Sequence, residues 1–157
     1  MKKSYVLATI AFLGLMSCSG DETNDAKYIF EFDEARFKQE KAAWEKANYQ
    51  NYSFTFSSRS SSYGLIENNI TVVNGIATGD NEDMQTFTIS ELYENCENIA
   101  NSYLSGTKKN EGSYHISYYF KYNKEHHFPE EIAFTQYNMP PGGGGSSHEL
   151  TNFKITE

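Results

Sequence analysis

Residues 89–104 read ISELYENCENIANSYL, and the predicted architecture follows from this segment. Apolar residues recur in it at steps of three and four, the spacing of one face of a helix, while polar residues fill the other face. The apolar face consists of Ile89, Leu92, Tyr93, Cys96, Ile99, Ala100, Tyr103 and Leu104. A helix with such a stripe needs an apolar surface to lie on, so the flanking segments are expected to supply a sheet.

Both ends of this helix carry recognisable signals. Thr88 followed three residues later by Glu91 has the form of a capping box, and Ser90 is an alternative N-cap. Gly106 suits a C-terminal stop, because glycine adopts the left-handed conformation that often ends a helix. The sequence therefore predicts a helix that begins at Ile89 and ends at Leu104.

A second helix is predicted earlier in the chain, from about Glu34 to Asn48. Ala, Glu, Lys and Gln dominate this segment, and Asp33 stands where an N-cap is expected. Its apolar stripe is narrow, and Glu40 and Lys41 on the same face are expected to cover the stripe with their methylene groups. Trp44 is interpreted as a packing anchor rather than as a platform for a ligand.

Strand signals lie between the two helices. In residues 52–56, YSFTF, aromatic residues alternate with small polar ones, which predicts a half-buried strand. The serine-rich run from Ser57 to Ser62 is expected to be a loop. Asn74-Gly75 is a specific hairpin signal, with residues 76–78 as the returning strand. Met84–Phe87 is expected to form a short edge strand before the central helix.

The longest predicted strand follows the central helix and spans residues 113–123. Its alternation predicts that one face is buried against the helices and consists of Tyr114, Ile116, Tyr118, Phe120 and Tyr122. The opposite face would carry His115, Ser117, Tyr119 and Lys121. Residues 131–137 and 150–156 are predicted as two further strands, and the Pro-, Gly- and Ser-rich residues 140–147 as a mobile loop between them.

These elements predict an α+β fold in which two helices pack on one face of an antiparallel sheet of about five to six strands. Antiparallel pairing is expected because most connections are short. Residues 1–17 are assigned to a signal peptide, residues 18–30 to a flexible acidic tether, and residues 31–157 to a single α+β domain.

Residues 1–17 have the features of an export signal. Two lysines precede an apolar run, Tyr5 to Leu15, that is too short for a stable membrane span. The run ends in Leu15-Met16-Ser17-Cys18, which resembles the lipobox of bacterial lipoproteins. In that family the signal is cleaved before the cysteine, which is then acylated, so Cys18 is the predicted lipidation site and anchor. An ordinary secretory signal with an incidental cysteine is the alternative.

Composition limits the classes of partner. The full sequence of 157 residues has a formal net charge of −8. Nucleic acid is a poor partner for this chain, because binding to phosphates needs a basic patch and the sequence contains none. The acidity is interpreted as a contribution to solubility.

The sequence offers no recognisable catalytic, cofactor or metal site. Cys96 lies on the apolar helix face, where a buried and unreactive thiol is expected. The histidines, His126 and His127 among them, lack the spacings typical of metal ligands. Glu130 and Glu131 adjoin a strand, where neighbouring side chains face opposite ways, which argues against a paired-carboxylate site.

Several short motifs occur in a characteristic order. After the lipobox and a helix with one tryptophan come Tyr52-Ser53-Phe54, Val73-Asn74-Gly75, Ile89-Ser90-Glu91-Leu92-Tyr93, Tyr119-Phe120-Lys121-Tyr122-Asn123, His127-Phe128-Pro129-Glu130-Glu131-Ile132 and Asn152-Phe153. In this order the chain resembles, over roughly residues 37–155, the bacterial lipoprotein family catalogued as domain of unknown function 6174. The resemblance implies a lipoprotein, but the family has no established activity to transfer.

The sequence thus predicts a lipid-anchored protein of the bacterial cell envelope, held at the outer membrane by N-terminal acyl chains. Its expected role is non-enzymatic binding of an envelope protein or a glycan. The candidate binding face consists of His115, Tyr119 and Lys121, which would point outward from the long strand. Two alternatives stay open: an envelope hydrolase or other enzyme with an unrecognised site, and an inhibitor module of a periplasmic enzyme that uses the loop at 139–148.

Overall fold

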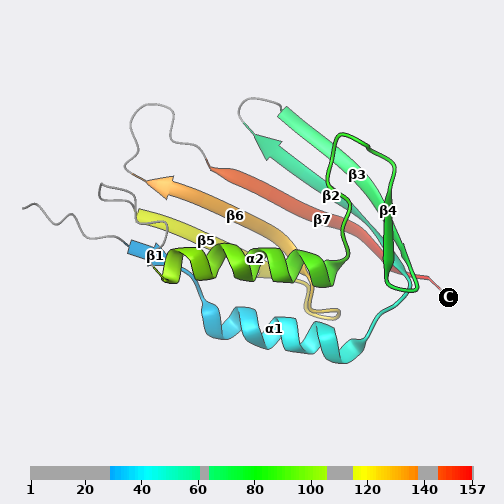
Figure 1. Ribbon diagram of the computed structural model, residues 1–157, viewed down its shortest axis with the longest axis horizontal. Helices are drawn as coiled ribbons and strands as arrows, with labels where there is room; N and C mark the ends of the chain where they lie inside the picture. Colours follow the sequence, from blue (N-terminus) through cyan, green and yellow to red (C-terminus); the bar gives the residue numbers. More distant parts are fainter. Residues whose placement is uncertain (1–28, 61–63, 106–114, 138–144, 157) are drawn as a thin grey trace, which may run out of the picture.

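A computed structural model describes residues 29–60, 64–105, 115–137 and 145–156. Along the chain the elements are β1 (Ile29–Glu31), α1 (Glu34–Ala47), β2 (Tyr52–Ser60), β3 (Gly64–Val73), β4 (Ile76–Gly79), α2 (Ile89–Leu104), β5 (His115–Tyr122), β6 (Pro129–Tyr137) and β7 (Ser146–Ile155). The two helices run antiparallel to each other across one face of the sheet (Figure 1). The predicted α+β class is therefore confirmed.

The sheet differs from the prediction in size and in pairing. Within the described residues it has seven strands in the order β1-β5-β6-β7-β2-β3-β4, rather than five to six. It is mostly antiparallel, but β1 pairs with β5 in parallel, with Ile29 beside His115. A strand of three residues is too short to give a periodic signal, and its partner lies far along the chain. Ile29 and Phe30, assigned to the tether from sequence, belong to β1.

Several strands also differ from the prediction in their bounds, and β6 begins at Pro129 rather than Glu131. Ser57–Ser60, expected to be a loop, continue β2, because β3 and β7 pair with this strand on both sides. Met84–Phe87 is not a strand, and the edge position is taken by β4. Strand β7 begins at Ser146 rather than Leu150. Ser57–Ser60 show no apolar alternation, but they are extended because the adjacent strands supply backbone hydrogen-bond partners on both sides.

Some predictions lie outside the described residues. They concern the signal peptide, Cys18, the first part of the tether, Ser61 and Ser62 of the serine-rich run, Gly106, Ser113 and Tyr114 of the long strand, and residues 140–144 of the glycine-rich loop. The rest of that loop, from Ser146 onward, is strand β7.

Helix α2 has the predicted bounds, and the backbone N–H groups at its N-terminus find hydrogen-bond acceptors in two ways. Thr88 and Glu91 form the predicted capping box, in which each side chain accepts a backbone N–H of the other residue. The N–H of Ile89 donates to the buried hydroxyl of Tyr52, with 3.0 Å between N and Oη. The first turn of α2 is therefore fixed to β2 as well as to its own cap.

Trp44 joins α1 to the rest of the core, as expected of a packing anchor. Its side chain is 2% exposed and meets the ring of Tyr52 edge-on, with 5.4 Å between ring centroids. The indole Nε1–H donates to Oγ of Ser90 at 3.2 Å. This tryptophan therefore contacts both β2 and the first turn of α2.

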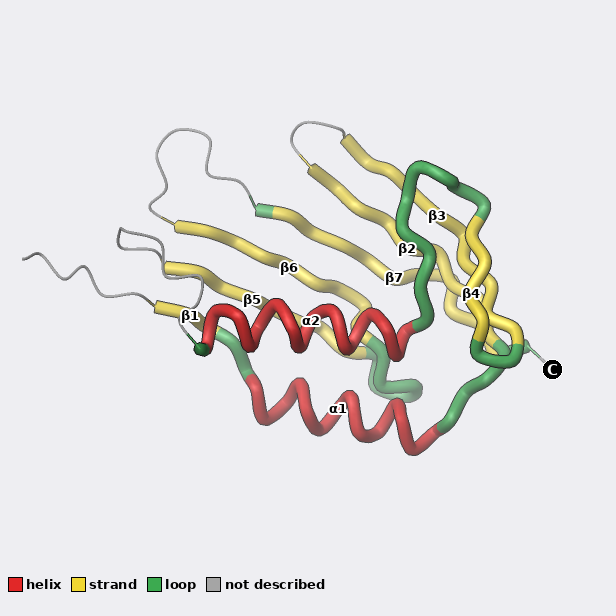
Figure 2. The backbone as a smooth tube through the Cα atoms, viewed as in Figure 1, coloured by secondary structure: helices red, strands yellow, loops and turns green. Residues whose placement is uncertain are grey.

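Asn68 of β3 holds the connection between β4 and α2. It is fully buried, and its Oδ1 accepts the N–H groups of Asp80 and Asn81 at 3.0 and 3.1 Å. Its Nδ2 donates to the carbonyl of Gln85 at 3.2 Å. These hydrogen bonds fix the connection, which leads into the first turn of α2 (Figure 2).

Candidate functional site

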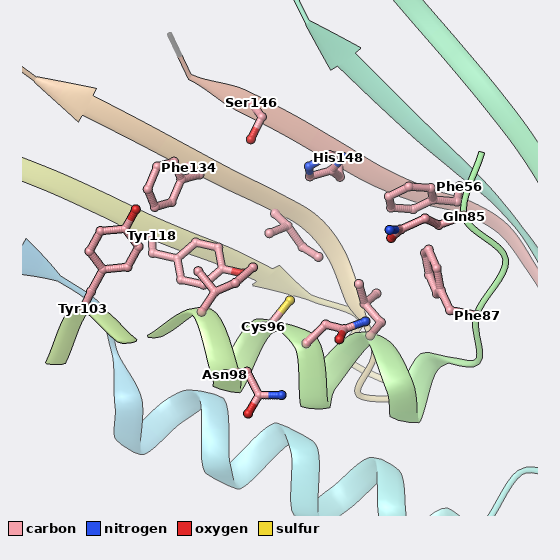
Figure 3. A pocket seen from close by; sticks show the side chains of 14 residues that line it. Phe56, Gln85, Phe87, Cys96, Asn98, Tyr103, Tyr118, Phe134, Ser146 and His148 are labelled. Carbon is pink, nitrogen blue, oxygen red and sulfur yellow. The ribbon is translucent and has the colours of Figure 1, made fainter. Parts of the chain in front are cut away.

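The candidate site is a cleft of about 590 Å³ between α2, the connection before it and the inner face of the sheet (Figure 3). Helix α2 forms one wall, and strands β2, β5, β6 and β7 form the floor. Aromatic and aliphatic side chains dominate the lining, which consists of Phe56, Gln85, Phe87, Leu92, Asn95, Cys96, Asn98, Ile99, Tyr103, Tyr118, Ile132, Phe134, Ser146 and His148. These residues form the cleft lining.

The cleft exists because α2 does not fully cover the sheet. Leu92 and Cys96 on its stripe are buried, but Ile99 on the same stripe is 40% exposed and borders the opening. On the opposite side β7 contributes the short side chain of Ser146, which leaves the space unfilled. The apolar stripe therefore extends beyond what packing inside the domain uses, and the excess faces the cleft.

Cys96 lies in this cleft but is not prepared to act as a nucleophile. Its side chain is 4% exposed, which confirms the predicted burial. Burial raises the pKa of the thiol to about 11, and the hydrogen bond with Tyr118 only partly offsets this effect. The pKa of the Tyr118 hydroxyl is also raised by burial. Both groups are therefore protonated at neutral pH, so neither a thiolate nor a phenolate is present in the cleft.

His148 is the other titratable group of the cleft. Its ring stacks on Phe56 with 5.3 Å between centroids and 15° between planes. Burial lowers its pKa below the usual value, so the ring is neutral at neutral pH. Its Nδ1 is buried and, within the described part of the chain, has no hydrogen-bond partner. A neutral imidazole with an unsatisfied nitrogen therefore borders an apolar space.

The cleft lining includes no Asp, Glu, Lys or Arg. Among the described residues, no group of three or more His, Cys, Asp or Glu side chains could hold a metal ion. In the same residues, neither helix is long and apolar enough to span a membrane. The chemistry that the cleft offers is thus contact with apolar groups and a small number of uncharged hydrogen bonds.

A second hollow, of about 670 Å³ and largely polar, lies near the β5–β6 turn. Glu130, Glu131 and Glu149 all border it, with Lys121 beside them. The sequence interpretation that Glu130 and Glu131 diverge was wrong. The pairing of β5 with β6 shifts register after Lys121, and such a bulge interrupts the alternation that separates neighbouring side chains.

Ion pairing already engages part of this hollow. Lys121 Nζ lies 3.2 Å from Glu130 Oε2, and Asn123 Nδ2 donates to Glu130 Oε1 at 2.9 Å. These contacts, the Asn123 hydrogen bond first, lower the pKa of Glu130. Glu131 and Glu149 are directly opposite each other on β6 and β7. The hollow is therefore negatively charged, with one carboxylate held ionised.

The three residues of the predicted binding face, His115, Tyr119 and Lys121, point outward as predicted, but they have different surroundings. Tyr119 is 52% exposed, whereas Ile116 and Tyr118 on the other face of β5 are buried. His115 Nε2 lies 2.9 Å from a carboxylate oxygen of Glu31, at the β1 edge. Lys121 belongs instead to the polar hollow. A binding role for these three residues stays a prediction.

The cleft residues that sequence reasoning missed are His148, Gln85 and Phe87. For His148 a signal existed: Ser146, His148 and Leu150 alternate, so extending the strand upstream of Leu150 places the imidazole on the inner face. For Gln85 and Phe87 there was none, because their segment is held by hydrogen bonds from Asn68 of another strand to Gln85 and Thr86. The chain matches no family model, no curated protein and no solved structure, and the resemblance to domain of unknown function 6174 stays a prediction from the quoted motifs.

Proposed function

We propose that this protein is a lipid-anchored component of the bacterial cell envelope that binds a small molecule in the cleft beneath α2 without transforming it. The lipobox ending at Cys18 supports the anchor and the address. The cleft lining supports the binding role. Its volume of about 590 Å³ is within the range of sites for small molecules, which are mostly apolar with a few polar groups.

The uncharged lining is the observation that carries the proposal. Covalent and general acid–base catalysis use a nucleophile with an adjacent base, or two carboxyl groups with different pKa values. The thiol of Cys96 is protonated at neutral pH, and none of the described residues that line the cleft is a carboxylate that could act as its base. Binding without chemistry therefore accounts for the lining better than catalysis does.

The polar hollow near the β5–β6 turn is the second candidate, as an envelope hydrolase. The observation in its favour is the convergence of Glu130, Glu131 and Glu149. A general acid of a glycoside hydrolase, however, needs a raised pKa. Asn123, and after it Lys121, lower the pKa of Glu130 instead, which makes this carboxyl group a poor proton donor. We therefore place the function in the cleft.

The lipid anchor at Cys18 is tested by metabolic labelling. Cells that express the protein should incorporate a labelled fatty acid into it, and Cys18→Ser should abolish incorporation. Label retained by the Cys18→Ser chain would contradict the anchor.

The binding role is tested with the neutral fluorescent probe N-phenyl-1-naphthylamine and the full-length Cys18→Ser chain, which carries no acyl chains. Ser146→Phe places a large side chain in the cleft and should weaken binding of the probe at least about tenfold, equivalent to ~1.4 kcal/mol. Ser147→Phe is the matched control, because Ser147 is the next residue of β7 and faces away from the cleft. Near-ultraviolet circular dichroism shows whether each variant is folded. An unchanged signal on adding probe to the parent chain, or equal loss in both variants, would argue against the cleft.

A further inference from the structure

We propose that the ligand of the cleft is an uncharged molecule with an apolar, ring-bearing body and one hydrogen-bonding group, and that this group pairs with the imidazole of His148. This inference rests on the proposed binding function and specifies what the cleft would take.

The absence of charge in the ligand follows from the cleft lining. None of the 14 lining residues carries a formal charge at neutral pH. An ionic group that enters such a space loses its hydration and meets no opposite charge, which is strongly unfavourable. Gln85, Asn95 and Asn98 supply amide groups that can bond polar atoms but cannot neutralise an ion. The cleft therefore selects against both anions and cations.

The ring-bearing body follows from the two aromatic groups at the ends of the cleft. Phe56 and Phe87 stand at one end and meet edge-on, with 4.8 Å between centroids. Tyr103 and Phe134 are at the other end, with 5.5 Å between centroids. Figure 3 shows these pairs on opposite sides of the space, with Cys96 between them on α2. A planar ring placed between the two pairs can make the offset and edge-on contacts that aromatic side chains favour.

The hydrogen bond follows from His148. Its ring lies over the cleft between Phe56 and Ser146 (Figure 3), and no described residue bonds its Nδ1. A buried polar atom without a partner destabilises the protein, so a ligand that satisfies it gains affinity. Either ring nitrogen can serve, because a half-turn about the Cβ–Cγ bond exchanges the ring edge that faces the cleft. The neutral ring offers one donor and one acceptor, which matches a hydroxyl group.

The test uses naphthalene and three derivatives that each add one group to it, and each compound competes with N-phenyl-1-naphthylamine for the full-length Cys18→Ser chain. We expect 2-naphthol to compete best and naphthalene about fivefold less well, the effect of one net hydrogen bond. 2-Naphthoate and 2-naphthylmethylammonium should compete at least about a hundredfold less well. In His148→Phe, the affinity for 2-naphthol should fall to that for naphthalene, while the affinity for naphthalene should be unchanged.

Glu149→Gln is the matched control for His148→Phe, because it alters the next residue of β7, which borders the polar hollow instead. It should leave all four affinities unchanged. Equal competition by the carboxylate or the ammonium compound would overturn the ligand class while the binding function stands. Equal weakening of naphthalene and 2-naphthol by His148→Phe would overturn the hydrogen bond. Failure of the fluorescent probe to bind the parent chain would instead count against the proposed function.

Discussion

His127 donates a hydrogen bond from Nδ1 to the carboxylate of Glu40, with 2.7 Å between Nδ1 and Oε2. Glu40 is only 5% exposed, and its other oxygen lies 2.6 Å from Nε of Arg36. The hydroxyl of Tyr93 donates to the backbone carbonyl of His127. Both helices therefore bond to His127 in the β5–β6 turn: α1 through the buried carboxylate of Glu40, and α2 through the hydroxyl of Tyr93.

Replacing Glu40 should weaken the attachment of α1 to His127. Glu40→Ala is expected to lower the free energy of unfolding by about 2 kcal/mol, because it removes the partner of two charged or polar groups. Both of those groups are partly exposed, so water limits the loss. Glu45→Ala on the same helix is the control, since Glu45 is largely exposed and should change stability by less than about 0.5 kcal/mol. Urea denaturation measures both, and equal effects would contradict the role of Glu40.

Truncating Trp44 should lower the free energy of unfolding by a large amount. Trp44→Ala removes a buried ring that contacts β2 and should cost about 3–5 kcal/mol. Trp44→Phe keeps part of the ring contact but loses the hydrogen bond to Ser90, so its cost should be clearly smaller. Urea melts of the two variants measure the difference. A loss under about 1 kcal/mol in Trp44→Ala would show that the ring does not anchor α1.

Cys96 should react slowly in the folded protein. Burial raises the pKa of its thiol to about 11, so little thiolate is present at pH values near 8. In the full-length Cys18→Ser chain, a chromogenic disulfide reagent should label Cys96 slowly in buffer and rapidly in denaturant. Native labelling as fast as that of free cysteine would reopen the possibility of a nucleophile.

Stability should depend on pH through His148. Burial lowers its pKa from 6.5, so below that pH the unfolded chain binds the proton more readily than the folded one. The stability present above pH 6.5 should therefore fall as the pH drops through the lowered folded pKa. Urea midpoints of the parent chain should decline more steeply over this range than those of His148→Phe, which lacks the group. Parallel profiles would show that His148 is not the group responsible.

The face that carries His115, Tyr119 and Lys121 should contribute little to stability. Replacing all three by Ala should cost about 0.5 kcal/mol at each site, since Tyr119 is half exposed and the ion pairs of the other two are partly exposed. Binding of the fluorescent probe in the cleft should be unchanged, because the cleft is on the other face of β5. A pull-down with the triple variant tests the predicted binding role. A loss of several kcal/mol would contradict the assignment of this face as solvent-exposed.

Short-range sequence signals were sufficient for several elements. The bounds of α2 follow from the apolar stripe and from Thr88 and Glu91, which lie one turn apart. The β3–β4 hairpin follows from Asn74-Gly75, both with positive φ, at 51° and 76°. The burial of Ile116 and Tyr118 follows from alternation within β5. In each case the residues that fix the structure are neighbours in sequence, so the pattern is visible without the fold.

The remaining elements and the cleft depend on pairing between segments that are far apart in the sequence. Strand β1 exists because β5 offers it an edge, and Ser57–Ser60 are strand because β3 and β7 lie on either side. The bulge after Lys121 brings Glu130 and Glu131 to one hollow, and Asn68 of β3 places Gln85 beside the cleft. These outcomes depend on hydrogen bonds between segments far apart in the chain, whose register no local pattern specifies. The cleft, which joins residues from β2, α2, β5, β6 and β7, could appear only once that register was known.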